Sequence, residues 1–207
     1  LEIREGGDGS RRVGALTDAE LTGPSQMTGG EPMDNAAPLC YRNIAIAFET
    51  GENDEGIGRN MYPRMAKAAF DNLAMDNPGS FIHIINLQKD KGHRVDYTLV
   101  TPWLKQYSRN PHPKTVSWVN YPMHDRYRSG FYNLAVTEPF DVSPGTPTDR
   151  TIFNMEIYGN TVTLKANTFD TATRQFGEIS HGKLIVYLAQ ELVDLAKPVT
   201  LVVNGNT

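Results

Sequence analysis

The sequence predicts an α/β domain followed by an all-β domain. Two apolar runs, NIAIAFE at 43–49 and FIHIINL at 81–87, flank a stretch with helical spacing, which indicates a parallel strand–helix–strand unit. Farther along, the pattern changes to short segments in which apolar and polar residues alternate, as is typical of an antiparallel β-sandwich. We therefore expect residues 39–111 to form part of a parallel α/β sheet and residues 112–207 to form a β-sandwich.

The elements of the α/β domain follow one another closely. Residues 1–38 are rich in glycine, proline and charge without a sustained period, and we expect them to be mostly irregular. The run at 43–49 is continuously apolar, as expected for a strand buried on both faces. MYPRMAKAAFDNLAMD, at 61–76, has helical spacing, with Asn60 as a possible N-cap and Pro63 in the first turn. The second strand follows the helix-breaking DNPGS.

The β domain is predicted from its turns and alternation. In TIFNMEIYGNTVTLKAN, at 151–167, two alternating segments flank Gly159 and Asn160, and a glycine-containing tight turn between such segments predicts a hairpin. Further strands are expected at TVSWVNY (115–121), FYNLAVT (131–137), KLIVYLA (183–189) and PVTLVVNG (198–205). Their spacing is that of an antiparallel sandwich.

Composition limits the kinds of partner. The 207 residues carry a net charge of -4, and no block of like charge occurs, so the chain lacks the basic surface that attracts nucleic acids or anionic membranes. Its apolar runs are much shorter than the roughly 20 residues of a membrane-spanning helix. We expect neither nucleic acid nor membrane as a partner. The single cysteine, Cys40, excludes an intramolecular disulfide and does not identify the compartment. We favour a periplasmic or secreted location.

Two candidate catalytic residues follow the predicted parallel strands. Asp54 lies in the loop after the first strand, and His93 lies in the loop after the second. The carboxyl ends of parallel strands meet at one edge of a sheet, and neighbouring strands lie about 4.8 Å apart, so we expect the carboxylate to reach the imidazole. An acid would then orient a base, with Glu52 as the alternative acid. The other interpretation is that both residues are solvated loop residues.

Other polar residues are weaker candidates. His93, Asp96 and His83 could be drawn as a metal site, but their spacing matches no metal-binding signature, and we predict neither a metal nor a cofactor. His124 and Asp125 are adjacent and would point apart on a strand.

Aromatic residues of the β domain suggest an alternative function. They could stack on a carbohydrate, although aromatic residues in strands more often fill a core or a domain contact. In this alternative the chain is a non-catalytic module that binds a glycan or a protein. The residues concerned are Trp118, Tyr121, Tyr127, Phe131 and Tyr132.

The order of several sequence blocks carries a family resemblance. These blocks are PLCYRNIAIAFETGENDEGIGRN, AAFDNLAMDNPGSFIHIINLQKDKGHRVDY, TPWLKQYSRNPHPKTVSWVN and VDLAKPVTLVVNG. Over roughly residues 28–205 the chain resembles the C-terminal half of bacterial α/β-hydrolase-fold proteins, esterases or peptidases with a small β domain after the hydrolase fold. The resemblance implies that Asp54 is the acid and His93 the base of a catalytic triad.

The nucleophile of such a triad is missing from the sequence. The hydrolase fold presents a serine in a G-x-S-x-G elbow upstream of the acid and the histidine, and no such motif occurs here. Ser25 lacks the second glycine of the motif and no buried strand precedes it, and Ser80 lies in the loop between the two predicted strands. We therefore expect a fragment of a serine hydrolase that is inactive alone, with a small ester or a peptide as the substrate of the complete enzyme.

Three explanations of the missing half are open. The N-terminal half of the fold has been removed, resides in another chain, or is absent because the protein is a degenerate relative. The start at Leu1 rather than at methionine favours the first two. An open edge on the partial sheet also invites pairing, so we expect the missing half or a second copy of the chain as a partner.

Overall fold

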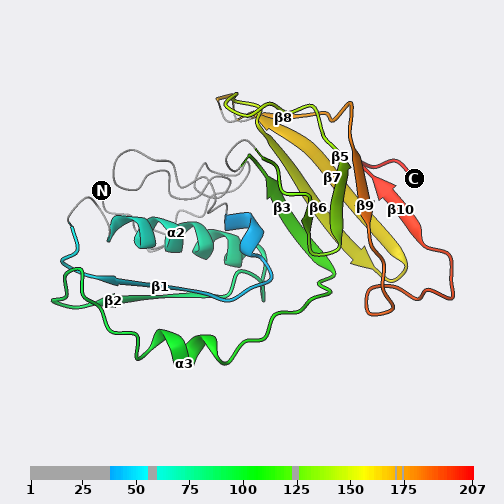
Figure 1. Cartoon of the computed structure of the whole chain (residues 1–207). Helices are drawn as coiled ribbons and strands as arrows, with labels where there is room; N and C mark the ends of the chain where they lie inside the picture. Colours follow the sequence, from blue (N-terminus) through cyan, green and yellow to red (C-terminus); the bar gives the residue numbers. More distant parts are fainter. Residues whose placement is uncertain (1–37, 56–59, 123–125, 171, 174) are drawn as a thin grey trace. The chain divides into compact units, whose positions relative to one another are not determined.

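This computed structural model describes residues 38–55, 60–122, 126–170, 172–173 and 175–207 (Figure 1). The chain divides between Arg109 and Asn110 into two compact units, close to the predicted boundary after residue 111. It is mostly β, and its sheets are largely antiparallel. The expected irregular segment at 1–38 lies, except for Pro38, outside the described residues.

The first unit contains the predicted strand–helix–strand arrangement. Its elements are η2 (Pro38–Tyr41), β1 (Ile46–Gly51), α2 (Met61–Asp76), β2 (His83–Gln88) and α3 (Val100–Leu104). The two strands pair in parallel, with Ile46 opposite His83 and Gly51 opposite Gln88. Among the described residues the sheet has these two strands only. None of the described helices has the length and apolar character needed to cross a membrane.

Helix α2 packs on one face of this sheet through Phe70. The buried Phe70 ring lies 5.7 Å from that of Phe48 on β1 and 6.3 Å from that of Phe81, measured between centroids. Most side chains of β1 and β2 are nevertheless only half-buried. The expected burial of 43–49 on both faces is therefore wrong, because each strand of a two-stranded sheet is an edge strand.

The second unit contains two facing sheets. Its strands are β3 (Thr115–Asn120), β4 (Gly130–Phe131), β5 (Leu134–Glu138), β6 (Arg150–Tyr158), β7 (Thr161–Asp170), β8 (Gln175–Gly177), β9 (Lys183–Val186) and β10 (Thr200–Val203). One sheet has the order β10-β7-β6-β3, with β8 also on β7, and the other has the order β4-β5-β9. Side chains from both sheets line one cavity, as in a sandwich. The predicted hairpin is β6–β7, with Tyr158 opposite Thr161.

Two features differ from the expected antiparallel sandwich. Strand β10 runs parallel to β7, because a long loop after β9 carries the chain to the other sheet before β10 begins. The expected strand at 131–137 is divided into β4 and β5 by Tyr132, whose positive φ of 53° turns the backbone so that the two strands pair with each other.

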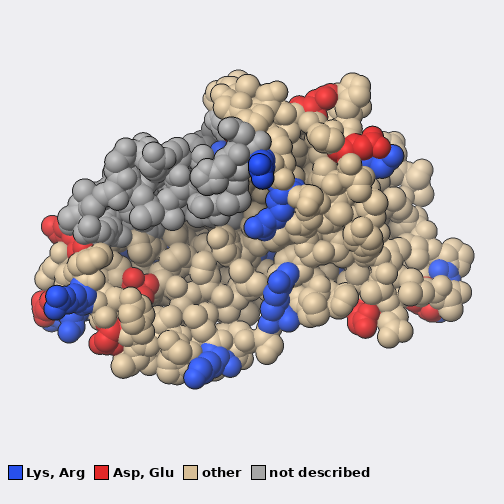
Figure 2. All heavy atoms as spheres, in the orientation of Figure 1, with Lys and Arg blue, Asp and Glu red and all other residues tan. Residues whose placement is uncertain are grey.

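Charged side chains are dispersed on the surface that Figure 2 shows. Lys and Arg side chains occur there as separate groups, as do Asp and Glu side chains, and other residues lie between these groups.

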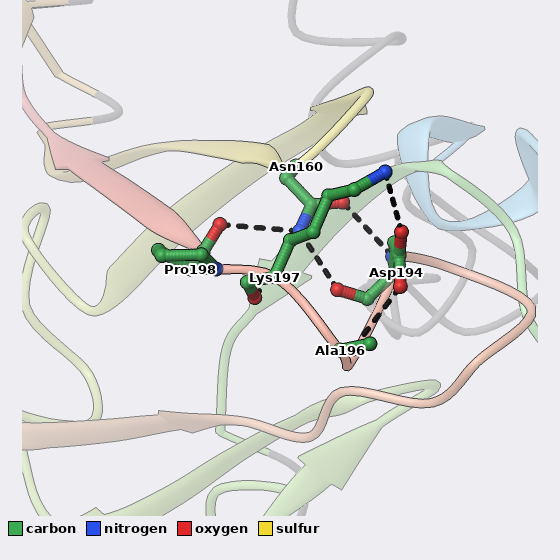
Figure 3. A network of polar contacts seen from close by, with 5 residues as sticks. All are labelled: Asn160, Asp194, Ala196, Lys197 and Pro198. Atoms are coloured by element: carbon green, nitrogen blue, oxygen red, sulfur yellow. Dashed lines mark hydrogen bonds and ion pairs between the residues drawn. The ribbon is translucent and has the colours of Figure 1, made fainter.

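Asn160, in the β6–β7 turn, holds the loop that leads into β10 (Figure 3). Its side-chain amide donates to the backbone oxygens of Asp194 at 2.8 Å and Pro198 at 3.1 Å, and its side-chain oxygen accepts the Asp194 N–H at 2.9 Å. The Thr200 N–H then donates to the Asn160 carbonyl at 2.9 Å. One side chain thus places the start of β10 beside β7.

Asp194 stabilises the same loop from within. Its carboxylate pairs with the Lys197 ammonium at 2.8 Å and accepts the Ala196 N–H at 3.0 Å. The bond from Lys197, followed by that from Ala196, lowers the pKa of the Asp194 carboxyl. Because both side chains of the ion pair are largely exposed, solvent screens this contribution.

Replacing Asn160 with alanine removes the bonds that fix this loop. We expect the free energy of unfolding of the second unit to fall by about 2 kcal/mol, since several backbone groups lose their partners. Urea denaturation of the full chain in a Trp103→Phe background, where Trp118 is the remaining tryptophan, measures it. Lys197→Ala is the control and should change little; an equally small effect of Asn160→Ala would contradict the assigned role.

Candidate functional site

The structure brings Asp54 and His93 together beyond the carboxyl ends of β1 and β2. The Nδ1 atom of His93 lies 3.2 Å from the Oδ2 atom of Asp54. The imidazole is 74% exposed, whereas the aspartate side chain is only 10% exposed. The expected contact between the two side chains is thus present, while their catalytic role stays a prediction.

A close backbone approach at Gly51 makes this contact possible. A Cβ atom on Gly51 would lie 2.7 Å from the carbonyl carbon of Lys91 and still closer to the carbonyl oxygens of Lys91 and Gly92. These are backbone atoms, so they cannot move aside without moving the loop that carries His93. The Asn53 N–H donates to the Lys91 carbonyl at 2.8 Å and holds the two segments at this distance. Glycine is therefore required at the end of β1.

Gln88, the last residue of β2, closes the other end of the His93 loop. Its side-chain oxygen accepts the Asp96 N–H at 3.0 Å, and its amide donates to the Asp96 carbonyl at 2.5 Å. The same amide lies 2.8 Å from Oε1 of Glu49 on β1, to which Asn86 also donates. Loop 89–96 is therefore tied to both strands.

The loop after β1 is held by its own hydrogen bonds. The Asn60 N–H donates to the Asp54 carbonyl at 3.1 Å, and the Asn60 side chain donates to the Glu52 carbonyl at 2.7 Å. Glu52, the alternative acid, accepts the Asp90 N–H through its carboxylate at 3.3 Å. Glu52 thus supports the backbone of the His93 loop, and Asp54 is the acid that lies on the imidazole.

The arrangement determines which nitrogen of His93 can act as a base. A carboxylate only accepts hydrogen bonds, so its contact with Nδ1 favours the tautomer that carries the proton there. In that tautomer the lone pair lies on Nε2, and the exposed ring presents it to solvent. A buried acid that orients an accessible imidazole is the arrangement of a general base.

A second histidine–aspartate pair, His83 with Asp71, has a structural role. His83 Nε2 lies 2.9 Å from the Asp71 carboxylate, and Nδ1 lies 2.7 Å from the Phe81 carbonyl. The side chain is largely buried and its ring packs against Phe70 at 5.4 Å. Both nitrogens face an acceptor, which leaves neither for a substrate. His83 thus joins α2 to β2.

The metal site drawn from His83, His93 and Asp96 does not form. His83 begins β2 and contacts Asp71, whereas His93 and Asp96 follow the other end of that strand. Within the part of the chain that the structure describes, no three His, Cys, Asp or Glu side chains converge as metal ligands.

The sequence reasoning missed a third pair, with a serine beside it. His181 Nδ1 lies 2.5 Å from Oδ2 of Asp141, and Ser180 Oγ lies 2.7 Å from that oxygen and 3.0 Å from the same Nδ1. The bonds from Ser180 and then His181 lower the pKa of the Asp141 carboxyl. Asp141 lies about 40 residues from Ser180 and His181 in sequence, so no local sequence pattern predicts the contact.

This Ser–His–Asp cluster lacks the geometry of a catalytic triad. A triad places the acid on Nδ1 and the nucleophile on Nε2 of one imidazole, whereas Ser180 and Asp141 share one nitrogen. The His181 and Asp141 side chains are 76% and 56% exposed, so water competes for each bond. The pair of His93 and Asp54 differs from this cluster, because the Asp54 carboxylate is shielded from solvent.

Ser80 and Cys40 lie near the opposite end of the parallel strands. They precede β2 and β1, and the Phe81 N–H bonds to the Arg42 carbonyl at that end. A six-residue strand such as β2 extends over about 20 Å, which separates them from His93. Ser25, His124 and Asp125 lie outside the described residues.

The proposed aromatic stacking face is partly buried. Trp118 and Tyr121 belong to the core. The Trp118 ring lies 5.1 Å from that of Phe153 and 5.8 Å from that of Phe131, and the Arg150 guanidinium lies 5.4 Å from the centre of the Tyr121 ring. Trp118 and Tyr121 thus pack the second unit, as the core interpretation predicts, and the alternative in which these two residues stack on a glycan is wrong.

Replacing Gly51 with alanine should separate His93 from Asp54. The added methyl group overlaps the Lys91–Gly92 backbone, so the loop must move. In nitrogen NMR spectra of the histidine rings, we expect the wild type to show the Nδ1–H tautomer at His93 and Gly51→Ala to lose it. Gly92→Ala is the control, since a Cβ there meets nothing within 4 Å. Retention of the tautomer in Gly51→Ala would refute the close-approach argument.

Comparison of the chain with protein families, with curated proteins and with solved structures finds no match. The resemblance to hydrolases rests on the sequence blocks given above and stays a prediction.

Proposed function

We propose that His93 and Asp54 are the base and the acid of a serine hydrolase that cleaves small esters or peptides. The observation that carries the proposal is the asymmetry of the pair, in which a shielded carboxylate lies on Nδ1 of an exposed imidazole. The other two histidine–aspartate pairs lack it, because His83 is enclosed and Asp141 is exposed.

In the proposed reaction, His93 transfers one proton in each of two half-reactions. Nε2 takes the proton of a serine hydroxyl as the serine oxygen attacks the carbonyl carbon, and Asp54 stabilises the resulting imidazolium. Nε2 then gives the proton to the departing alcohol or amine, which leaves an acyl-enzyme. A water molecule, deprotonated by the same nitrogen, attacks that acyl group, and Nε2 then gives this proton to the serine oxygen as the acid is released.

The location of the pair supports this role. Open α/β sheets place their reactive residues outside the carboxyl ends of the strands, and both loops leave that edge. The bonds of Gln88 and the approach at Gly51 hold the His93 backbone before substrate arrives. Such preorganisation is what positioned proton transfer requires.

The nucleophile is proposed to come from a segment with a G-x-S-x-G elbow, in a longer product of the same gene or in a partner chain. Neither Ser80 nor Cys40 can serve, because each lies near the opposite end of the parallel strands. A base and an acid without a nucleophile and an oxyanion hole lose most of the rate enhancement. The 207-residue chain alone should therefore be a poor catalyst.

The test compares p-nitrophenyl ester hydrolysis by the chain alone and by a product extended upstream of Leu1. We expect background rates from the former and turnover from the latter if the extension brings a serine elbow. There, His93→Ala should lower kcat by about 10²–10⁴-fold, whereas His181→Ala, the matched control, should not. The proposal fails if no elbow is encoded, if His93→Ala keeps full activity, or if the chain alone is active through Ser25 or Ser80.

A further inference from the structure

The second unit has an apolar groove between its two sheets. The groove encloses about 380 Å³ and lies between β9 and β10, which are terminal strands of their sheets (Figure 1). Val162 and Leu164 of β7 form its floor, Leu184 and Val186 of β9 form one wall, and Leu201 and Val203 of β10 form the other. The sandwich is thus open on this side.

Among the described residues, part of the groove lining has no cover. Inward-facing side chains of a closed sandwich are buried between the sheets, and Val162 on the floor is only 1% exposed. Leu201, which alternates onto the same inner side as Val203, is 47% exposed. Among the described residues, no segment closes the groove over Leu201.

The backbone of β10 also presents an open edge there. The N–H groups of Thr200 and Asn204 point toward β7 and bond to the carbonyls of Asn160 and Leu164, and peptide groups alternate in direction along a strand. The N–H and C=O groups of Leu201 and Val203 therefore point to the other side. Val203 finds a partner there in Asn206, whereas none of the described strands lies beside Leu201.

The residues after β10 form the turn of a β-hairpin. Val203 and Asn206 exchange two backbone hydrogen bonds, of 2.7 and 2.9 Å. The intervening Asn204 and Gly205 have φ values of 48° and 85°, the pattern of a type I′ turn, for which Asn-Gly is the preferred pair. The next residues of a hairpin run back along the first strand, so the turn directs the backbone along the open edge.

Asn204 anchors this turn to β7. Its side-chain oxygen accepts the Ala166 N–H at 2.9 Å, and its amide donates to the Ala166 carbonyl at 3.0 Å. The Asn204 N–H bonds to Leu164 at 2.9 Å. The asparagine side chain thus continues the pairing with β7, so that the turn has a defined position and direction.

We propose that the groove is the seat of a further strand, which continues the hairpin beyond Asn206 in the same polypeptide and runs antiparallel to β10. The two-residue turn defines its register. Thr207 stands opposite Val202, the next residue opposite Leu201, and the third residue after Thr207 opposite Val199. Directly opposite residues of an antiparallel pair share one face of the sheet. The first and third positions after Thr207 would therefore face the groove, which favours apolar side chains there, whereas the second would face away.

The turn favours this occupant over a free ligand or a second copy. A small apolar molecule would fill the volume of the groove but leave the backbone N–H and C=O groups of Leu201 unpaired. A second copy of the chain could pair with these groups, but the Asn204–Gly205 turn would not direct it there. A strand in the same chain begins with its first pair already formed and has a high effective concentration at the groove.

The test adds four residues after Thr207 of the full chain. One tail, Val-Thr-Val-Thr, has apolar side chains at the first and third positions, and the control, Thr-Val-Thr-Val, has the same composition shifted by one. We expect the first tail to raise the Tm of the second unit by about 4 °C or more and to slow hydrogen exchange of the Leu201 N–H at least about tenfold. The control should do neither, and Gly205→Val should abolish the gain.

Other results would overturn the proposal. Equal effects of the two tails, or no effect of either, would exclude the register. If hydrogen exchange of the Leu201 N–H in the unextended chain slows as the protein concentration rises, the groove is instead the binding site of a second copy of the chain. A saturable rise in Tm with decanoate, without a gain from the first tail, would assign it to a small apolar ligand.

Discussion

The contact between two backbone segments at Gly51 is the constraint on which the candidate site depends. The loop after β2 lies directly on the end of β1 because no side chain stands between them. This approach lets Asn53 bond to Lys91 and brings the His93 ring to the Asp54 carboxylate. With any side chain at residue 51 the loop would lie farther out, and the His93 ring would move away from the Asp54 carboxylate.

The three histidine–aspartate pairs among the described residues show that burial decides what such a pair can do. In His83–Asp71 the ring is enclosed and both nitrogens are used, so the pair joins a helix to a strand. In His181–Asp141 both side chains are exposed, and water weakens the bond between them. Only in His93–Asp54 is the acid shielded while the base remains accessible, which is what proton abstraction requires.

Two asparagines give the second unit its unusual last strand. Asn160 bonds to the loop before β10, and Asn204 bonds to β7 after it. Each side chain has a donor and an acceptor and so imitates a peptide group. Together they hold β10 parallel to β7, and the outer edge of β10 remains open beside an apolar groove.

The sequence by itself determined features that depend on neighbours along the chain. Apolar spacing predicted the helix at 61–76, the alternation around Gly159 predicted the β6–β7 hairpin, and the common direction of two parallel strands predicted that Asp54 would meet His93. Only the tertiary structure decided the half-burial of β1, the core position of Trp118, the use of His83 by Asp71 and the parallel β10. These features depend on which distant segments pack together, and periodicity records only which side of an element is apolar.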